Sequence, residues 1–259
     1  MKLTFRQRAT WIAHLFKAVA YQYHRDLGIR LAPLHHRDLG IRLAPLLPED
    51  GVAIDVGAHA GQHAKLFARA MPRGTVYAFE PGSYALSILR KTVFLHRLSN
   101  VVVVPRGLSD APAVMTLSIP VKKRGSLGFG LSHLGAERPD REAVQEEVHL
   151  TTLDSFVAEN GIGRIDFIKA DIEGWEPHFL RGALTSIGRF RPAIMLEVNE
   201  RAEAGTPDGK GVFEILEPFG YAIFKTFEHD AYRMTRVDRY DGPADYVFVP
   251  EARAQLLAE

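Results

Sequence analysis

A glycine-containing turn follows the first β-branched run of the chain and is the first candidate for chemistry. The stretch 54–64 reads IDVGAHAGQHA, in which Asp55, Gly57 and Gly61 give the pattern D-x-G-x-x-x-G. Glycine is needed where the backbone must come close to a ligand. A dinucleotide fingerprint would have a second glycine at the position of His59, and a phosphate loop would continue with G-K-S or G-K-T. The turn therefore disfavours both of those ligands.

Acidic and small polar residues end the next two runs. Glu80 lies 25 residues after Asp55, and Ser109 and Asp110 form the turn GLSD. An acid at the end of a second strand can accept both hydroxyls of a ribose. A short acceptor after the third strand could meet an adenine amino group. Together these residues describe an adenosine pocket without a phosphate cradle, which predicts S-adenosylmethionine as the cofactor.

Three carboxylates follow two later runs and are the candidate catalytic residues. Asp171 and Glu173 end the fourth run, and Glu197 lies near the end of the fifth. One of them could serve as the base that takes a proton from a hydroxyl. Alternatively, Asp171 could hold the methionine ammonium, Glu173 could cap the next helix, and Glu197 could orient the hydroxyl. Three carboxylates could also bind a divalent cation, but no metal is expected.

Two histidines are weaker candidates for the base. His178 lies seven residues after Asp171 on a predicted helix, where a surface or packing role is more usual, and His133 lies in a long insertion. Trp175 and Phe179 are four residues apart on the same helix, a spacing that favours core packing over sugar stacking.

The elements that must position these residues alternate along the chain. Short β-branched runs separated by helical stretches predict an α/β fold with a doubly wound, Rossmann-like and mostly parallel sheet. The carboxyl ends of such strands meet at one edge, where ligands bind. Two last runs have no helix between them and should pair antiparallel through a polar loop. The runs are 52–57, 75–81, 101–107, 165–171 and 193–199, followed by 221–227 and 245–250.

An insertion at 119–150 interrupts the alternation with four glycines and a basic run at 122–124. Because long insertions in compact domains are usually functional or disordered, we expect either a substrate lid or a passive flap.

The first 50 residues are predicted to form a helical extension of a catalytic domain at 51–259. Apolar residues between Phe5 and Tyr23 recur at helical spacing, which indicates a helix packed on the main domain or on a partner, or else a helix on a membrane surface. The segments 24–34 and 36–46 both read HRDLGIRLAPL. Two identical copies are too few and too short for a repeat architecture, so one copy is expected to be redundant.

Composition narrows the classes of protein. The chain has 259 residues, no cysteine, and 32 Lys and Arg against 31 Asp and Glu. The lack of cysteine excludes disulfides and thiolate metal sites and favours the cytoplasm. A net charge of +1 gives no whole-molecule field for nucleic acid, and no apolar stretch is long enough to span a membrane.

Several motifs resemble the FkbM-type methyltransferases: IDVGAHAG, YAFEP, GLSD, TTLDSF, and IKADIEGWEPHFLRGA followed by IMLEV. The K-x-D-x-E-G-x-E pattern, from Lys169 to Glu176, is the most specific of them. The resemblance implies a class I methyltransferase fold and S-adenosylmethionine-dependent O-methylation of a sugar, glycolipid or secondary metabolite. His59 departs from the asparagine usual in that turn. The candidate cofactor-binding residues are Asp55, Gly57, Ala58, His59, Gly61, Glu80, Pro81, Ser109 and Asp110.

Two other functions stay open on the sequence. The same cofactor domain could methylate RNA, although the neutral charge and the lack of an RNA-binding module disfavour this. The pocket could also bind its ligand without catalysis. We expect a small-molecule or glycan hydroxyl as the acceptor.

Overall fold

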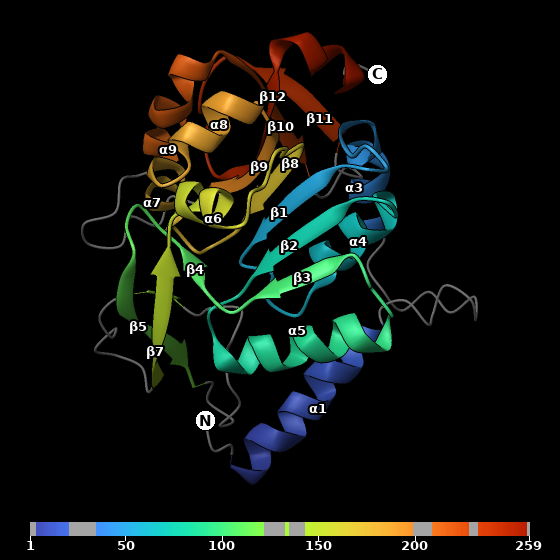
Figure 1. Ribbon diagram of the computed structural model, residues 1–259, viewed down its shortest axis with the longest axis vertical. Coiled ribbons are helices and arrows are strands. Elements are labelled where there is room, and N and C mark those ends of the chain that lie inside the picture. Colours follow the sequence, from blue (N-terminus) through green and yellow to red (C-terminus); the bar gives the residue numbers. More distant parts are fainter. Residues whose placement is uncertain are drawn as a thin grey trace.

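The computed structural model describes residues 4–20, 35–121, 133–134, 143–198, 209–227 and 233–257. In this part of the chain a twisted eight-stranded sheet has helices on both faces (Figure 1). Its strands are β1 (Val52–Val56), β2 (Thr75–Phe79), β3 (Val101–Val104), β8 (Phe167–Ala170), β9 (Ala193–Val198), β10 (Tyr221–Phe227), β11 (Arg233–Val237) and β12 (Ala244–Pro250). They follow one another across the sheet in the order β11-β10-β12-β9-β8-β1-β2-β3.

The five strands β1, β2, β3, β8 and β9 are parallel, as predicted. Their apolar runs are nearly continuous because helices cover the sheet on both sides. The chain starts in the middle with β1, adds β2 and β3 on one side, and then returns to place β8 on the other side. The strand order thus reverses between β1 and β8, and an open α/β sheet binds ligands at the carboxyl ends around such a reversal.

The two C-terminal runs pair antiparallel, as predicted, but their arrangement holds one more strand. β12 lies between β9 and β10, and β11 pairs with the outer side of β10. The run RMTRV of β11 is mostly polar and exposed, so it has little of the apolar pattern that marks a strand. The polar loop predicted between the two runs therefore contains an edge strand.

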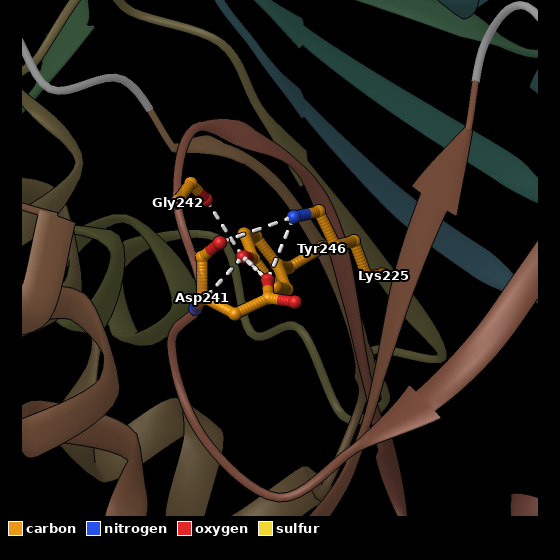
Figure 2. A network of polar contacts seen from close by, with 4 residues as sticks. All are labelled: Lys225, Asp241, Gly242 and Tyr246. Atoms are coloured by element: carbon orange, nitrogen blue, oxygen red, sulfur yellow. Dashed lines mark hydrogen bonds and ion pairs between the residues drawn. The ribbon is translucent and has the colours of Figure 1, made fainter.

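A polar network fixes the connection from β11 to β12 (Figure 2). The Lys225 ammonium lies 2.7 Å from Asp241 Oδ1, and the Tyr246 hydroxyl donates to the same oxygen at 2.7 Å. The Gly242 carbonyl oxygen also lies 2.7 Å from that hydroxyl. This network holds the start of β12 at the carboxyl edge of the sheet. Asp245, the residue before Tyr246, therefore also lies at that edge.

The helices form two layers. On one face lie α3 (His35–Leu43), α4 (Gln62–Ala70), α5 (Ser83–Leu95) and the 3-10 helix η5 (Glu251–Leu257). On the other lie α6 (Leu153–Glu159), α7 (Glu176–Arg181), α8 (Leu184–Phe190) and α9 (Gly209–Leu216). Alternate strand residues serve the two layers: Ala53 and Phe167 pack under the first, and Ile54 and Ile168 under the second.

Local sequence explains where several helices begin. Thr152 in TTLDSF is the N-cap of α6, and its hydroxyl accepts the Ser155 N–H at 3.0 Å. Pro177 lies in the first turn of α7, where proline loses no hydrogen bond.

The region of the predicted insertion forms a second sheet in its described residues. Its strands are β4 (Gly107–Leu108), β5 (Ala113–Pro120), β6 (His133–Leu134) and β7 (Ala143–Thr151), in the order β4-β7-β5-β6. Leu117 and Val148 pack against Tyr84 on α5, and Glu146 Oε1 accepts the Ser83 N–H at 2.6 Å. The second sheet is thereby attached to the start of α5, directly after the turn that contains Glu80.

The N-terminal helix packs on the main domain, which is one of the arrangements predicted for it. The helix α1 (Phe5–Ala20) lies along α5 (Figure 1). The Trp11 indole N–H donates to Ser87 Oγ at 2.8 Å, and His14 Nδ1 is 3.0 Å from the Tyr84 hydroxyl. His96, at the end of α5, adjoins Ala18, so the ends of the two helices lie together.

The second copy of the duplicated segment is part of the core. It forms most of α3 and the 3-10 helix η1 (Ala44–Leu46). Its Leu39, Leu43 and Leu46 are buried in the same cluster as Phe67 of α4. The first copy, 24–34, lies outside the described residues. No helix among the described residues is long and apolar enough to cross a membrane.

Candidate active site

The glycine turn is fixed between β2 and β8. The N–H groups of Gly57 and Ala58 both donate to the Phe79 carbonyl oxygen, at 3.1 and 2.9 Å. Gly57 has a φ of 73°, and a Cβ there would lie 2.3 Å from the Asp171 carbonyl oxygen. His59 also has a left-handed φ of 55°, a conformation that Asn and His adopt more readily than most residues. Close packing against β8 therefore requires Gly57, and His59 can replace the family's asparagine.

Glu80 is hydrogen-bonded to this turn. Its Oε2 accepts the His59 N–H at 2.9 Å, and its Oε1 accepts the Gly82 N–H at 2.8 Å. Burial raises the pKa of Glu80 to about 7, although both backbone hydrogen bonds act to lower it. Each carboxylate oxygen can accept one further hydrogen bond, so Glu80 can still hold two hydroxyl groups. Pro81 packs beside Gly107 at the start of the second sheet.

Asp55 is a buried carboxylate that makes no well-formed hydrogen bond with the described residues. The backbone of Ala64 adjoins it and acts to lower its pKa, and the Lys169 ammonium is 4.0 Å from Oδ1. Burial raises the pKa of Asp55 to about 6 despite that cation. A buried carboxylate in this state can accept a ligand that brings N–H donors or positive charge.

Lys169 links the acids of neighbouring strands. In the strand register it lies beside Asp55, and its ammonium is 3.1 Å from Asp171 Oδ2. Burial acts to lower the pKa of Lys169, but Asp171 and Asp55 outweigh it and raise the pKa. Lys169 was part of the sequence motif, but its role was not predicted, because a lysine on an apolar strand carries no sign of which acids adjoin it.

The carboxylates predicted at the fourth and fifth strands do come together. Burial acts to raise the pKa of Asp171, but Lys169, a hydrogen bond with Glu197 and the charge of His63 hold that pKa well below its usual range. The Asp171 and Glu197 carboxyl groups therefore lie within hydrogen-bond reach of each other. Asp245 lies directly opposite Glu197 in the strand pairing. Sequence could not supply Asp245, because it joins the group only when β12 inserts beside β9.

Glu173 lies in a tight turn between β8 and α7. Glu173 and Gly174 both have left-handed backbones, with φ of 55° and 97°. The residue at the N-cap of α7 is Trp175, and the Ile172 N–H donates to Glu176 Oε1 at 2.9 Å. The structure therefore assigns the loop-holding carboxylate to Glu176. A left-handed non-glycine residue is a form of backbone strain that is often found at functional sites.

The predicted adenine-side residues contact α7. Ser109 Oγ donates to Asp110 Oδ1 at 3.0 Å and accepts the Trp175 indole N–H at 3.1 Å. His178 Nδ1 lies 3.1 Å from Asp110 Oδ2, and its ring stacks on Trp175 at 4.2 Å. His178 is therefore held by a carboxylate. Phe179 is fully buried, as predicted, whereas Trp175 is half-buried and hydrogen-bonded.

The remaining predicted residues are placed as follows. Ala58 is buried in the core beside the glycine turn, and Gly61 has a left-handed φ of 87° at the start of α4. His133 lies on β6, which pairs with β5. Among the described residues no three His, Asp or Glu side chains form a set that could hold a metal ion.

The strand order, the antiparallel β12 and the glycine turn after β1 together define a class I methyltransferase fold. The O-methyltransferase from Bacillus cereus, solved in complex with SAH, is 14% identical with a TM-score of 0.50, over 91% of this chain and 89% of that one. A putative rRNA methylase from Clostridium thermocellum is 9% identical with a TM-score of 0.50, over 82% and 94%. At such identities the likeness concerns the fold alone.

Comparison with family models classifies the chain more closely than its fold does. A family model described as the methyltransferase FkbM domain matches residues 55–223. The chain belongs to this family, and the resemblance seen in its motifs is confirmed. Methyltransferase 1 of Beauveria bassiana is 26% identical over an alignment of 192 residues, and the match covers 68% of this chain and 74% of that protein. Methyltransferase sdnD of Sordaria araneosa is 27% identical over an alignment of 159 residues, and that match covers 52% of this chain and 61% of that protein.

Proposed function

We propose that the protein uses S-adenosylmethionine to methylate a hydroxyl group of a sugar, glycolipid or secondary metabolite. The observation that carries the proposal is the contact between Glu80 and the glycine turn. The Glu80 oxygens accept the N–H groups of His59 in that turn and of Gly82, and each carboxylate oxygen can accept a second hydrogen bond. The cofactor named for the Bacillus cereus relative supports the same ligand.

Each cofactor-side residue then has a role that its surroundings allow. Glu80 accepts the two ribose hydroxyls, and Asp55 accepts the methionine ammonium, which supplies the N–H donors that the protein does not. Ser109 and Asp110 adjoin the adenine. S-adenosylmethionine would supply a methyl group on a positively charged sulfur, so the protein has to provide orientation and a proton acceptor.

The acceptor side is formed by Asp171 and Glu197. Asp171 is held ionised by Lys169 and is therefore a poor base, but it can orient a hydroxyl or a positive charge. Glu197, which adjoins Asp171, could as a carboxylate take the proton of the acceptor hydroxyl. We thus assign the general base to Glu197 and orientation to Asp171.

Calorimetry tests the cofactor assignment. The wild type should bind S-adenosylhomocysteine and should not bind NAD. Glu80→Ala should weaken binding by about 1–3 kcal/mol, the range for a lost hydrogen bond to a charged group. Glu49→Ala is a matched control, because Glu49 is an exposed acid paired with Arg73. Tight NAD binding, or equal losses in both variants, would overturn the assignment.

A transfer assay tests the acceptor. Labelled methyl groups from S-adenosylmethionine should enter metabolite or glycolipid fractions of an extract. Since the fold also occurs in a putative rRNA methylase, an RNA fraction is included. Label confined to RNA would replace the proposed acceptor but leave the cofactor assignment intact.

A further inference from the structure

The helix α1 has two apolar sides, and only one of them packs on the protein. Trp11, Leu15 and Ala18 belong to a cluster with α5 and the second sheet. Ile12 and Phe16, one helical turn apart, are 61% and 69% exposed. In Figure 1 α1 lies outside α5, at the end of the molecule away from η5. Its second apolar side has no role in the fold as described.

The end of α5 also exposes large apolar side chains. Phe94 is 80% exposed, and Leu95 beside it is 53% exposed. Ala18 adjoins His96, which directly follows α5, so the last turns of α1, which contain Phe16, lie toward this end of α5. Single exposed apolar residues are common on protein surfaces. Four large ones on two packed helices suggest an interaction surface.

The same part of the chain concentrates positive charge. Residues 4–20 and 56–109 contain ten Lys and Arg but a single acid, Glu80, although the whole chain is almost neutral. Glu80 is buried, so it does not offset charge at the surface. The exposed cations on the two helices are Arg8, Lys17, Arg90 and Lys91. Neither α1 nor α5 contains an acidic residue.

We propose that α1 and α5 bind the surface of an anionic phospholipid bilayer. Helices that combine Lys and Arg with exposed Phe, Leu and Ile lie in the interface with their apolar side chains at the acyl boundary. Ile12, Phe16 and Phe94 would enter that boundary, while the cations contact the headgroups. Each cation near an anionic leaflet strengthens such binding several-fold.

Two other occupants fit less well. RNA would pair with the cations, but its phosphates would leave Ile12, Phe16 and Phe94 in water. A second copy of the chain on a two-fold axis would place the same cations opposite one another, because such an interface uses the same patch twice. A bilayer satisfies both the charge and the apolar side chains.

Vesicle flotation provides the test. The full chain should float with vesicles of phosphatidylcholine containing about 30% phosphatidylglycerol, and much less with phosphatidylcholine alone. Ile12→Ser combined with Phe16→Ser should lower the apparent affinity at least about tenfold, since two large apolar groups leave the boundary. Lys17→Glu combined with Arg90→Glu should do the same, and added salt should weaken binding.

Matched controls use exposed residues elsewhere. Val114→Ser on β5 is the control for the substitutions at Ile12 and Phe16. Arg189→Glu combined with Arg239→Glu is the control for the charge reversals on α1 and α5. These controls should leave flotation unchanged, and all variants should keep wild-type melting and S-adenosylhomocysteine affinity. The assay needs no methyl acceptor, so its outcome is independent of the proposed reaction.

Three results would overturn the proposal. One is a correctly folded wild-type protein that does not float with anionic vesicles. Another is an equal loss in patch and control variants. The third is a different occupant: an RNA oligonucleotide that binds regardless of Ile12→Ser and Phe16→Ser without vesicle binding, or a dimer in sedimentation that these substitutions dissociate.

Discussion

Lys169 decides how the acids around it can act. It is buried on β8 between Asp55 and Asp171, and its ammonium favours the ionised form of both. Asp171 adjoins it more closely and has the depressed pKa, whereas burial still raises that of Asp55. Neighbouring carboxyl groups with different pKa values can take different roles at one pH. Asp171 is therefore the acid of this pair that stays ionised and can orient a ligand.

Removal of either carboxylate at the acceptor side should slow catalysis. Asp171→Asn and Glu197→Gln should each reduce methyl transfer about a hundredfold or more, the usual contribution of a positioned acid or base. His178→Ala should cost much less, because the proposed base is a carboxylate. Initial rates with labelled cofactor measure this, after calorimetry shows intact cofactor binding. If His178→Ala abolished turnover while both carboxylate variants stayed active, a histidine base would replace Glu197.

Cofactor affinity should depend on pH through Glu80. Only the ionised carboxylate can accept two hydroxyl donors, and burial raises its pKa to about 7. Because the free protein loses that charge as pH falls, Glu80 should make S-adenosylhomocysteine bind about tenfold more tightly at pH 8 than at pH 6, and Asp55 should add about twofold, for about twentyfold in all. Calorimetry across this range measures it. Glu80→Gln should reduce the dependence to about twofold, the part left by Asp55, and an unchanged twentyfold dependence would exclude Glu80 as its source.

Sequence located single site residues better than it located their contacts. The acids at positions 55, 80, 171 and 197 were found from the ends of apolar runs, because parallel strands bring those ends to one edge. The opposition of Asp245 to Glu197 needs the strand pairing, and the contact of His178 with Asp110 needs the packing of α7 on the GLSD turn. Both contacts join residues far apart in the chain.

At the scale of elements, the end of α7 is pressed against the GLSD turn. Gly182 follows the helix, and a Cβ there would lie 1.9 Å from the Ser109 carbonyl oxygen. The close approach keeps Trp175 and His178 within reach of Ser109 and Asp110. The backbone after α7 thus packs directly against the backbone of the GLSD turn, and both segments adjoin the proposed cofactor site.

Gly182→Ala should destabilise the protein because neither backbone can easily move. We expect a loss of about 1–3 kcal/mol in the free energy of unfolding, as for other overpacked sites. Gly163→Ala is the matched control, since a Cβ there meets nothing within 4 Å and should be neutral or slightly stabilising. Denaturant unfolding measures both. Equal stability of the two variants would contradict the close approach.

Strands were predicted where apolar runs were strong and missed where they were weak. All seven predicted runs are strands of the central sheet, with ends that differ by a few residues. β5 and β7 are half-exposed, and β11 is mostly exposed, so their sequences contain many polar residues. Such strands depend on pairing with neighbours more than on their own pattern, which is why sequence did not reveal them.

For the whole molecule, the sequence predicts the class of fold but not how the N-terminal part joins it. The predicted extension of 50 residues contributes Leu39, Leu43 and Leu46 to the core under α4. Its helical spacing was readable, but the surface it covers was not, because an amphipathic pattern does not name its partner. The predicted domain boundary at residue 50 stays a prediction.

A chain with a single copy of the duplicated segment should fold normally. Deletion of residues 24–35 removes only His35, the first residue of α3, and leaves the rest of α3 and η1 intact. The melting temperature should fall by less than about 4 °C, which corresponds to about 1 kcal/mol at this size. Calorimetric melting measures it. In the shortened chain Leu43→Ala should cost about 2–5 kcal/mol, since Leu43 is fully buried. A larger loss from the deletion itself would show that the first copy contributes packing.

The buried second copy also has a consequence for the gene. The two copies start twelve positions apart, at His24 and His36, so the repeated unit is a whole number of codons. Loss of residues 24–35 or of residues 35–46 keeps the reading frame and yields the same shorter protein, because each deletion leaves one whole copy and removes the residue between the copies. A lineage can therefore gain or lose this repeat in one recombination event without changing any leucine that α3 presents to the core.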